Sequence, residues 1–182
     1  MKLQEKGEGF PGQRIVVLPR SVVELARKHA LINGLLPTDV GYFPRARGHL
    51  RERRDGVDQA IFIYCTKGAG WCEFAEHYHV IKAGELLVVP PQTPHVYGTD
   101  ESQPWSIHWF HAVGALLASF LNELGVTVDQ PVVRIGEDIQ VLALFEELLD
   151  SVEHGYTTLQ LLHASQTLSH LLAVMIRAPK TK

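Results

Sequence analysis

The sequence lacks long apolar runs and carries no excess of basic residues. No apolar stretch approaches the ~20 residues that a membrane-spanning helix needs, and the opening residues, MKLQEKGEGF, lack the apolar stretch of a secretory signal. Seventeen basic residues against 20 acidic ones give a net charge of −3, so no basic field is available to hold a polyanion. We therefore predict a cytoplasmic chain that enters no membrane and does not bind DNA by itself.

Cysteine is also scarce, since the 182 residues include only Cys65 and Cys72. Two cysteines are too few for a disulfide framework. They flank the loop at residues 67–70 and could face each other across a hairpin. Two interpretations stay open, a pair of reduced and buried thiols or a redox switch, and a cytosolic chain favours the first.

The chain changes character near residue 111, although its length and its 46% hydrophobic residues suit one core. Short β-type runs separated by glycine, proline and aspartate turns precede this point, and segments of helical period follow it. One short helix interrupts the opening runs, where Ser21 and Glu24 have the spacing of a capping box. We predict a β-barrel at residues 1–111 and a helical segment at residues 112–182.

The second part predicts two to three helices. The first ends at Gly125, the second runs from Ile139 with apolar residues on one face, and the third begins at Thr157 or Thr158 and continues to Pro179. The last helix is apolar over more than one face. It therefore predicts packing against the barrel and against a second copy of the chain, with coverage by the barrel alone as the open alternative.

The run GELLVVPPQTPHVYG, residues 84–98, resembles the second cupin motif. Gly84 permits a tight turn, the run LLVV predicts a buried strand, and Pro90 with its neighbouring proline ends the ladder. His95 then begins a returning strand, and Tyr97 shares its face because side chains alternate along a strand.

The first cupin motif, which supplies two histidines and a glutamate in metal-binding cupins, has no counterpart here. Residues 53–67 contain no histidine and no glutamate, and one imidazole cannot form a three- or four-ligand site. His77 and His79 share a strand face, but the alternation predicts that Tyr78 and Val80 point inward and leave the histidines in solvent. We therefore expect no metal, no cofactor and no catalytic residues.

Over residues 14–177 the order of landmarks resembles that of the N-terminal domain of AraC-family transcription regulators. The landmarks are Leu36-Pro37, Gly41-Tyr42, His49, Arg53, Gly56, the runs at 61–65 and 68–71, the motif at 84–98, Pro104-Trp105 and the run at 108–111, followed by paired helices.

This resemblance implies a mainly β fold with α-helices: a cupin-like barrel, of the double-stranded β-helix or jelly-roll type, followed by two to three C-terminal helices. It further implies a bacterial regulator whose barrel binds a small effector, a sugar or related metabolite, and which forms a homodimer through the helices. The family reads DNA through a C-terminal helix-turn-helix domain, which we expect beyond Lys182.

The resemblance also implies an effector site. Leu36 stands where a small polar residue contacts the sugar in the arabinose regulator of this family, and Ile107 where that protein has a histidine; both departures favour a less polar or differently shaped ligand. Tyr42 is an expected neighbour, as are Tyr64 and His111. The predicted ligand-binding residues are Arg53, His95, Tyr97, Trp109, Ile107, Leu36 and Tyr42.

Several alternatives stay open. A small metal-dependent cupin enzyme, an isomerase or dioxygenase, competes with the regulator, as does a purely structural dimerisation module. Arg53 could pair with Asp58 or Glu52 at the surface instead of binding a ligand, and Trp109 could be a core residue. Residues 1–12 suit either a regulatory arm or, as we favour, a disordered tail.

Overall fold

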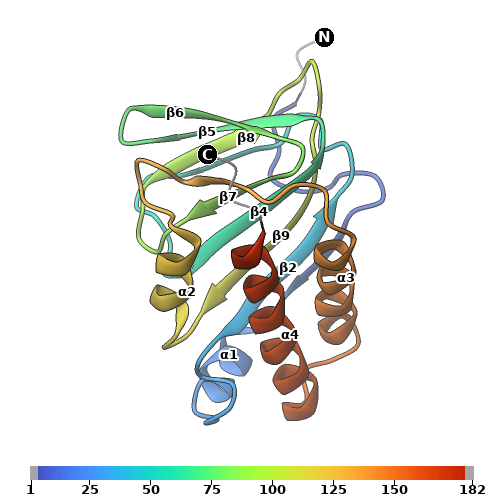
Figure 1. Ribbon diagram of the computed structural model, residues 1–182. Coiled ribbons are helices and arrows are strands. Elements are labelled where there is room, and N and C mark those ends of the chain that lie inside the picture. The colour runs from blue at the N-terminus through green and yellow to red at the C-terminus, as the bar shows by residue number, and fades with distance from the viewer. Residues whose placement is uncertain (1–3, 179–182) are drawn as a thin grey trace.

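The computed structural model describes residues 4–178, which form two facing antiparallel sheets with helices outside one of them (Figure 1). The six-stranded sheet has the order β1-β2-β9-β4-β7-β10 and the four-stranded sheet the order β3-β8-β5-β6. The strands are β1 Arg14–Val17, β2 Leu36–Phe43, β3 Leu50–Arg53, β4 Ala60–Lys67, β5 Ala69–Phe74, β6 His77–Lys82, β7 Glu85–Val89, β8 His95–Thr99, β9 Ser106–Val113 and β10 Val132–Arg134. The helices are α1 Arg20–Ala26, α2 Leu117–Leu124, α3 Ile139–Glu153 and α4 Thr158–Arg177. This is the predicted cupin-like barrel with helices after it.

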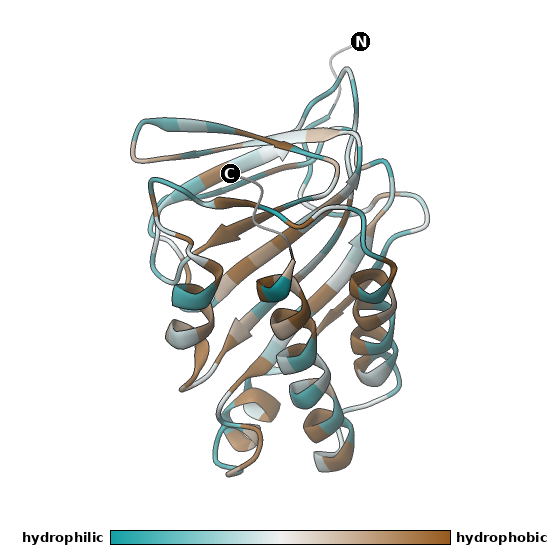
Figure 2. Cartoon of the chain, in the orientation of Figure 1, coloured by the Kyte–Doolittle hydropathy of each residue, from teal (hydrophilic) through white to brown (hydrophobic). Residues whose placement is uncertain are grey.

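Both faces of the six-stranded sheet are buried, and they belong to two separate cores. On one face Phe62 and Phe110 stack on each other, with Phe145 of α3 beside them, under the helices. On the other face Ile61 and Ile63 point toward the four-stranded sheet. Strand residues alternate between faces, so nearly continuous apolar runs such as that of β4 are required here. Figure 2 shows these runs as long brown stretches along the central strands.

The helical segment packs across the outer face of this sheet, where α3 and α4 lie side by side (Figure 1). Thr157 caps α4 through a capping box with Gln160, and Gly125 ends α2 in the left-handed conformation at φ 73°, both as predicted. No helix within the described residues is long and apolar enough to span a membrane.

The start of α1 differs from the prediction. The helix begins at Arg20 with Pro19 as its N-cap, and no side chain caps it. Glu24 instead pairs with Arg20 at 2.9 Å. With Pro19 at the N-cap, Ser21 and Glu24 both lie inside the helix, so neither occupies the position that a capping box requires.

The division at residue 111 is not a clean boundary between strands and helices. Strand β9 continues to Val113, and the connector between α2 and α3 returns to the barrel as β10, where Val133 pairs with Leu86 of β7. The two parts therefore share one sheet.

The motif at residues 84–98 folds as predicted. Gly84 has φ 83° in the turn before β7, which ends at Val89 just before Pro90, and β8 begins at His95. The same motif therefore supplies one strand to each sheet of the barrel, β7 to the six-stranded sheet and β8 to the four-stranded one.

The two cysteines are free and buried. Cys65 lies on β4 opposite Ile107, and Cys72 lies on β5 in the other sheet, so they do not face each other across a hairpin. Burial raises the pKa of each thiol to about 12, which keeps both protonated and unreactive.

The prediction for β6 is wrong. Tyr78 and Val80 are 61% and 49% exposed, and His79 lies on the inward side with Ile81. Pairing with β5 decides which residues of β6 point inward, because the inward residue Cys72 of β5 lies opposite His79. Tyr78 stacks on Trp71 on the outer surface at 5.9 Å between ring centroids.

Candidate functional site

A cavity lies between the two sheets, with about 500 Å³ of empty space that includes open solvent at its mouth. Its apolar walls come mainly from the six-stranded sheet, while its cationic residues come from β3 in the facing sheet. The apolar lining residues are Ile15, Val17, Phe43, Ile61, Ile63, Ile107 and Trp109. The polar ones are Glu8, Asp39, His49, Arg51, Arg53, Tyr97 and His111, with Gly7 completing the lining.

Arg53 is held in the cavity by neutral partners. Its Nη1 lies 3.4 Å from the Tyr97 hydroxyl and 3.5 Å from His95 Nε2. His95 Nδ1 lies 2.7 Å from the Thr93 carbonyl and donates to it, which leaves Nε2 as the acceptor facing Arg53. Burial lowers the pKa of His95, so the imidazole stays neutral beside the guanidinium.

His95 and Tyr97 share the inward face of β8, as predicted, with their rings parallel at 5.7 Å. Tyr97 lines the cavity, whereas His95 lies behind Arg53 and does not. His95 therefore orients Arg53 rather than contacting a guest directly. Arg53 forms no ion pair with Asp58 or Glu52; Glu52 pairs with Arg54 instead.

Trp109 presents an unpartnered donor. The residue is 7% exposed, and within the described residues its buried indole Nε1 has no hydrogen-bond partner. Gly41 lies opposite on β2, and a Cβ built there would come within 2.5 Å of the indole ring. The glycine thus leaves the space that Trp109 occupies, and the orphan N–H favours a guest that brings an acceptor.

Asp39 and His111 form the anionic side of the cavity. They lie opposite each other on β2 and β9, with 3.4 Å between Asp39 Oδ2 and His111 Nδ1, and the Thr38 hydroxyl donates to the same oxygen at 2.6 Å. Burial alone would raise the pKa of Asp39, but the hydrogen bonds from His111 and Thr38 hold it below its ordinary value. The carboxylate is therefore ionised and keeps free acceptor capacity.

His49 is a neutral member of the lining. Burial, followed by the nearby charges of Arg51 and Arg53, lowers its pKa to about 3. Its Nδ1 accepts a hydrogen bond from Trp105 Nε1 at 3.1 Å. The ring is therefore fixed as an uncharged wall.

Residues 4–13 cover the mouth of the cavity, so the prediction of a disordered tail is wrong for them. Lys6 exchanges backbone hydrogen bonds with the chain around His49, and Phe10 is buried against Phe43 and His49 at ring distances of 5.0 and 5.3 Å. Gly7 and Glu8 line the cavity. Residues 1–3 lie outside the described residues.

The prediction that Leu36 and Tyr42 line the site is also wrong. Leu36 is fully buried in the core beneath the helices, and Tyr42 packs on His108 on the same side at 4.5 Å. In β2 the inward residues are Asp39, Gly41 and Phe43, so even-numbered positions face away from the cavity. Tyr64 also lies on the helix side, where its hydroxyl donates to the Gly136 carbonyl.

The structure adds residues that sequence reasoning missed. Asp39, Arg51 and His49 line the cavity, and His111, expected only as a neighbour, joins them. For Arg51 the sequence did contain a signal. Arg51 precedes Arg53 by two positions on β3, and residues two apart on a strand share a face. Residues 4–178 contain no group of three or more His, Cys, Asp or Glu side chains placed to hold a metal ion.

The fold is a cupin-like β-barrel that holds a cavity with polar and aromatic walls between its two sheets. Residues 37–172 match the family described as the AraC-like ligand binding domain. The chain belongs to this family.

The curated relatives are named as regulatory proteins of operons. The chain is 33% identical over 159 residues to the MmsAB operon regulatory protein of Pseudomonas aeruginosa, covering 85% of this chain and 51% of that protein. A shorter match, 36% over 53 residues, joins it to the raffinose operon transcriptional regulatory protein RafR of Pediococcus pentosaceus, covering 29% and 19%. The chain thus spans about half the length of the first relative and less of the second.

Solved structures similar to the barrel include YhaK from Escherichia coli, at 12% identity and a TM-score of 0.44 over 59% of this chain and 47% of that one. KdgF from Halomonas sp. is 18% identical with a TM-score of 0.36, over 61% and 87%.

Proposed function

We propose that this chain is the effector-sensing and dimerising part of a cytoplasmic AraC-type transcription regulator and has no enzymatic activity. The effector is a small polar, sugar-like metabolite that occupies the cavity between the sheets. DNA is read by a separate part of the longer regulator. The observation that carries the proposal is the buried, unpartnered Trp109 Nε1 in a cavity that Asp39 and Arg53 also line.

The cavity chemistry suits a hydroxylated guest. The indole of Trp109 offers a flat apolar face, Arg53 offers a fork of donors, and ionised Asp39 accepts from hydroxyl groups. The isoleucine side chains along the six-stranded sheet contribute an apolar wall. A guest with both apolar and hydroxylated faces uses all of these groups at once.

The homodimer is proposed on family membership. Within one chain the apolar surface of α4 is already covered by α3 and the sheet, so the breadth of that surface does not by itself require a second copy. Ile139 and Leu159, at the first turns of α3 and α4, are 86% and 77% exposed and are candidate contacts for a partner chain.

A thermal-shift screen of sugars and related metabolites tests the proposal, because a ligand that binds only the folded state raises its stability. We expect at least one compound to raise Tm, and Trp109→Ala and Arg53→Ala to abolish the shift. Sedimentation should show the same dimer for both variants. An unchanged shift in the variants would refute the assigned cavity, and no shift with any compound would favour a purely structural dimerisation module.

A further inference from the structure

The cationic side of the cavity is formed by two arginines of one strand. Arg51 and Arg53 are alternate residues of β3, both half-buried and both in the cavity lining. Within the described residues neither side chain forms an ion pair with a carboxylate. The next residue, Arg54, points outward and pairs with Glu52 at 2.9 Å. Balanced charge is thus present on the outer face of β3 and absent on its inner face.

The neighbours of the two arginines are neutral. Among the described residues, the hydrogen-bond partners of the Arg53 side chain are His95 and Tyr97, at 3.5 and 3.4 Å. The guanidinium of Arg51 lies against the backbone of Gly7, where an added Cβ would come 2.1 Å from its Cζ. His49, between them and the aromatic core, is itself kept uncharged. The two guanidinium groups therefore hold positive charge without a directly paired carboxylate among the described residues, although Asp39 lies near enough for the charge of Arg53 to lower its pKa.

The cavity lining contains two acids, Glu8 and Asp39, and neither forms an ion pair with these arginines. Asp39 comes from the facing sheet and shares its Oδ2 with His111 and Thr38. Its position gives the cavity two unlike ends, an acceptor end at Asp39 and His111 and a donor end at Arg51 and Arg53. Guanidinium groups recognise carboxylates through paired N–H donors, and such charge-assisted bonds are about twice as strong as neutral ones.

We propose that the effector is a small hydroxylated carboxylate, whose acid group lies between Arg51 and Arg53 and whose hydroxyl groups reach Asp39 and Trp109. This inference rests on the proposed function, because it assigns a ligand class to the same cavity. It separates an acidic effector from a neutral sugar of the same size, since a neutral sugar brings no carboxylate to pair with either guanidinium group.

Matched pairs of compounds test this assignment in the intact chain by calorimetry and thermal shift. The pairs are D-gluconate with D-glucose, D-glycerate with glycerol, and L-lactate with 1,2-propanediol. We expect at least one acid to bind about tenfold or more tightly than its neutral partner, which a charge-assisted pair supports. Arg51→Gln and Arg53→Gln should each weaken that acid about tenfold or more, Arg53→Lys less, and Arg54→Gln not at all.

The variants must keep the wild-type circular dichroism spectrum without ligand, and Arg53→Lys keeps the test usable where a glutamine variant fails to fold. Neutral compounds that bind as tightly as the acids, or acid affinity unchanged in both glutamine variants, would overturn the carboxylate assignment while the proposed function stands. Binding by neither class would overturn both together.

Discussion

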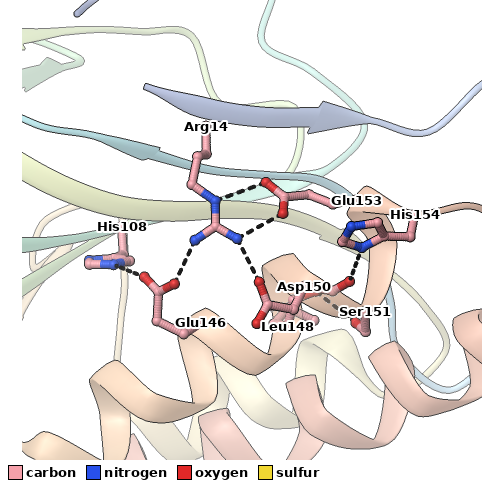
Figure 3. A network of polar contacts seen from close by, with 8 residues as sticks. All are labelled: Arg14, His108, Glu146, Leu148, Asp150, Ser151, Glu153 and His154. Atoms are coloured by element: carbon pink, nitrogen blue, oxygen red, sulfur yellow. Dashed lines mark hydrogen bonds and ion pairs between the residues drawn. The ribbon is translucent and has the colours of Figure 1, made fainter. Parts of the chain in front are cut away.

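Arg14 of β1 and Glu146 of α3 form an ion pair with 2.6 Å between Nη1 and Oε2, which ties the edge of the barrel sheet to the helical segment (Figure 3). Asp150 and Glu153, further along the same helix, bind the same guanidinium at 2.6 and 2.8 Å. Glu146 also accepts from His108 at 3.1 Å, so β9 joins the network. The remaining face of β1 points into the cavity, and one short strand thus contacts both the cavity and α3.

Replacing Arg14 with glutamine should destabilise the chain. The change leaves the acidic side chains of α3 without their shared cation, and because the ion pairs are partly exposed we expect a loss of about 1 kcal/mol in the free energy of unfolding. Urea denaturation at low salt measures the loss, which should shrink at 1 M salt. Arg20→Gln, which removes the exposed pair with Glu24, is the control and should cost less. Equal losses in the two variants would contradict a special role for Arg14.

Replacing Gly41 with alanine should reshape the cavity. The new methyl group would overlap the Trp109 indole, which must move, and overpacking of this kind costs about 1–3 kcal/mol. We expect a lower Tm and a shifted tryptophan fluorescence spectrum, to which Trp109 contributes with the two other tryptophans, together with weaker binding of any effector found by thermal shift. Gly34→Ala is the matched control, because its new methyl group meets only the end of the Leu116 side chain, outside the cavity. A cavity that binds unchanged in Gly41→Ala would count against the position assigned to Trp109.

The outcome at β8 shows what the sequence can predict. The run at residues 84–98 contains its own turn, strand and strand-ending signals, so the shared face of His95 and Tyr97 follows from local spacing alone. The helix ends at Gly125 and Thr157 are equally local. These features depend on a few adjacent residues and were predicted correctly, whereas the equally local capping box of Ser21 and Glu24 was not formed.

The errors at β2 and β6 arise because pairing with other strands decides which of their residues point inward. Register in β2 shifts between Pro37 and Asp39, and the buried runs on both faces give no polar alternation to reveal which side faces the cavity, so Leu36 and Tyr42 were assigned to the wrong face. The phase of β6 depends on its pairing with β5. The contact of Arg14 with α3 joins residues more than 130 positions apart, which no local pattern indicates.

Replacing Phe10 with alanine should loosen residues 4–13. Phe10 is buried between Phe43 and His49 and is the main apolar anchor of this segment. We expect faster tryptic cleavage after Lys6, followed by mass spectrometry, and several-fold weaker effector binding because Gly7 and Glu8 line the cavity. Phe10→Leu keeps an apolar anchor and should lie close to wild type. Cleavage at the wild-type rate in Phe10→Ala would show that the backbone bonds of Lys6 hold the segment without it.

Acid should destabilise the chain through its buried histidines. Burial lowers the pKa of His49 to about 3, and that of His95 and His108 in the same direction, whereas the unfolded chain has ordinary values near 6.5. Above pH ~6.5 these rings are neutral in both states and add no pH dependence. Below it the unfolded state takes up protons that the folded state refuses, so stability falls as pH falls, by up to about 1.4 kcal/mol per pH unit for each histidine.

His49→Asn isolates one of these contributions, because the amide keeps an acceptor for Trp105 but has no proton to take up. The variant loses packing at every pH, so the informative quantity is the slope of unfolding free energy between pH 7 and 4.5, measured by urea denaturation. We expect the slope to flatten, recovering about 2 kcal/mol at the acid end relative to wild type. His77→Asn, at an exposed position on β6, is the control and should retain the wild-type slope. Parallel curves for His49→Asn and wild type would mean that His49 takes up its proton in the folded chain, and its neutral role beside Arg51 and Arg53 would fall with that result.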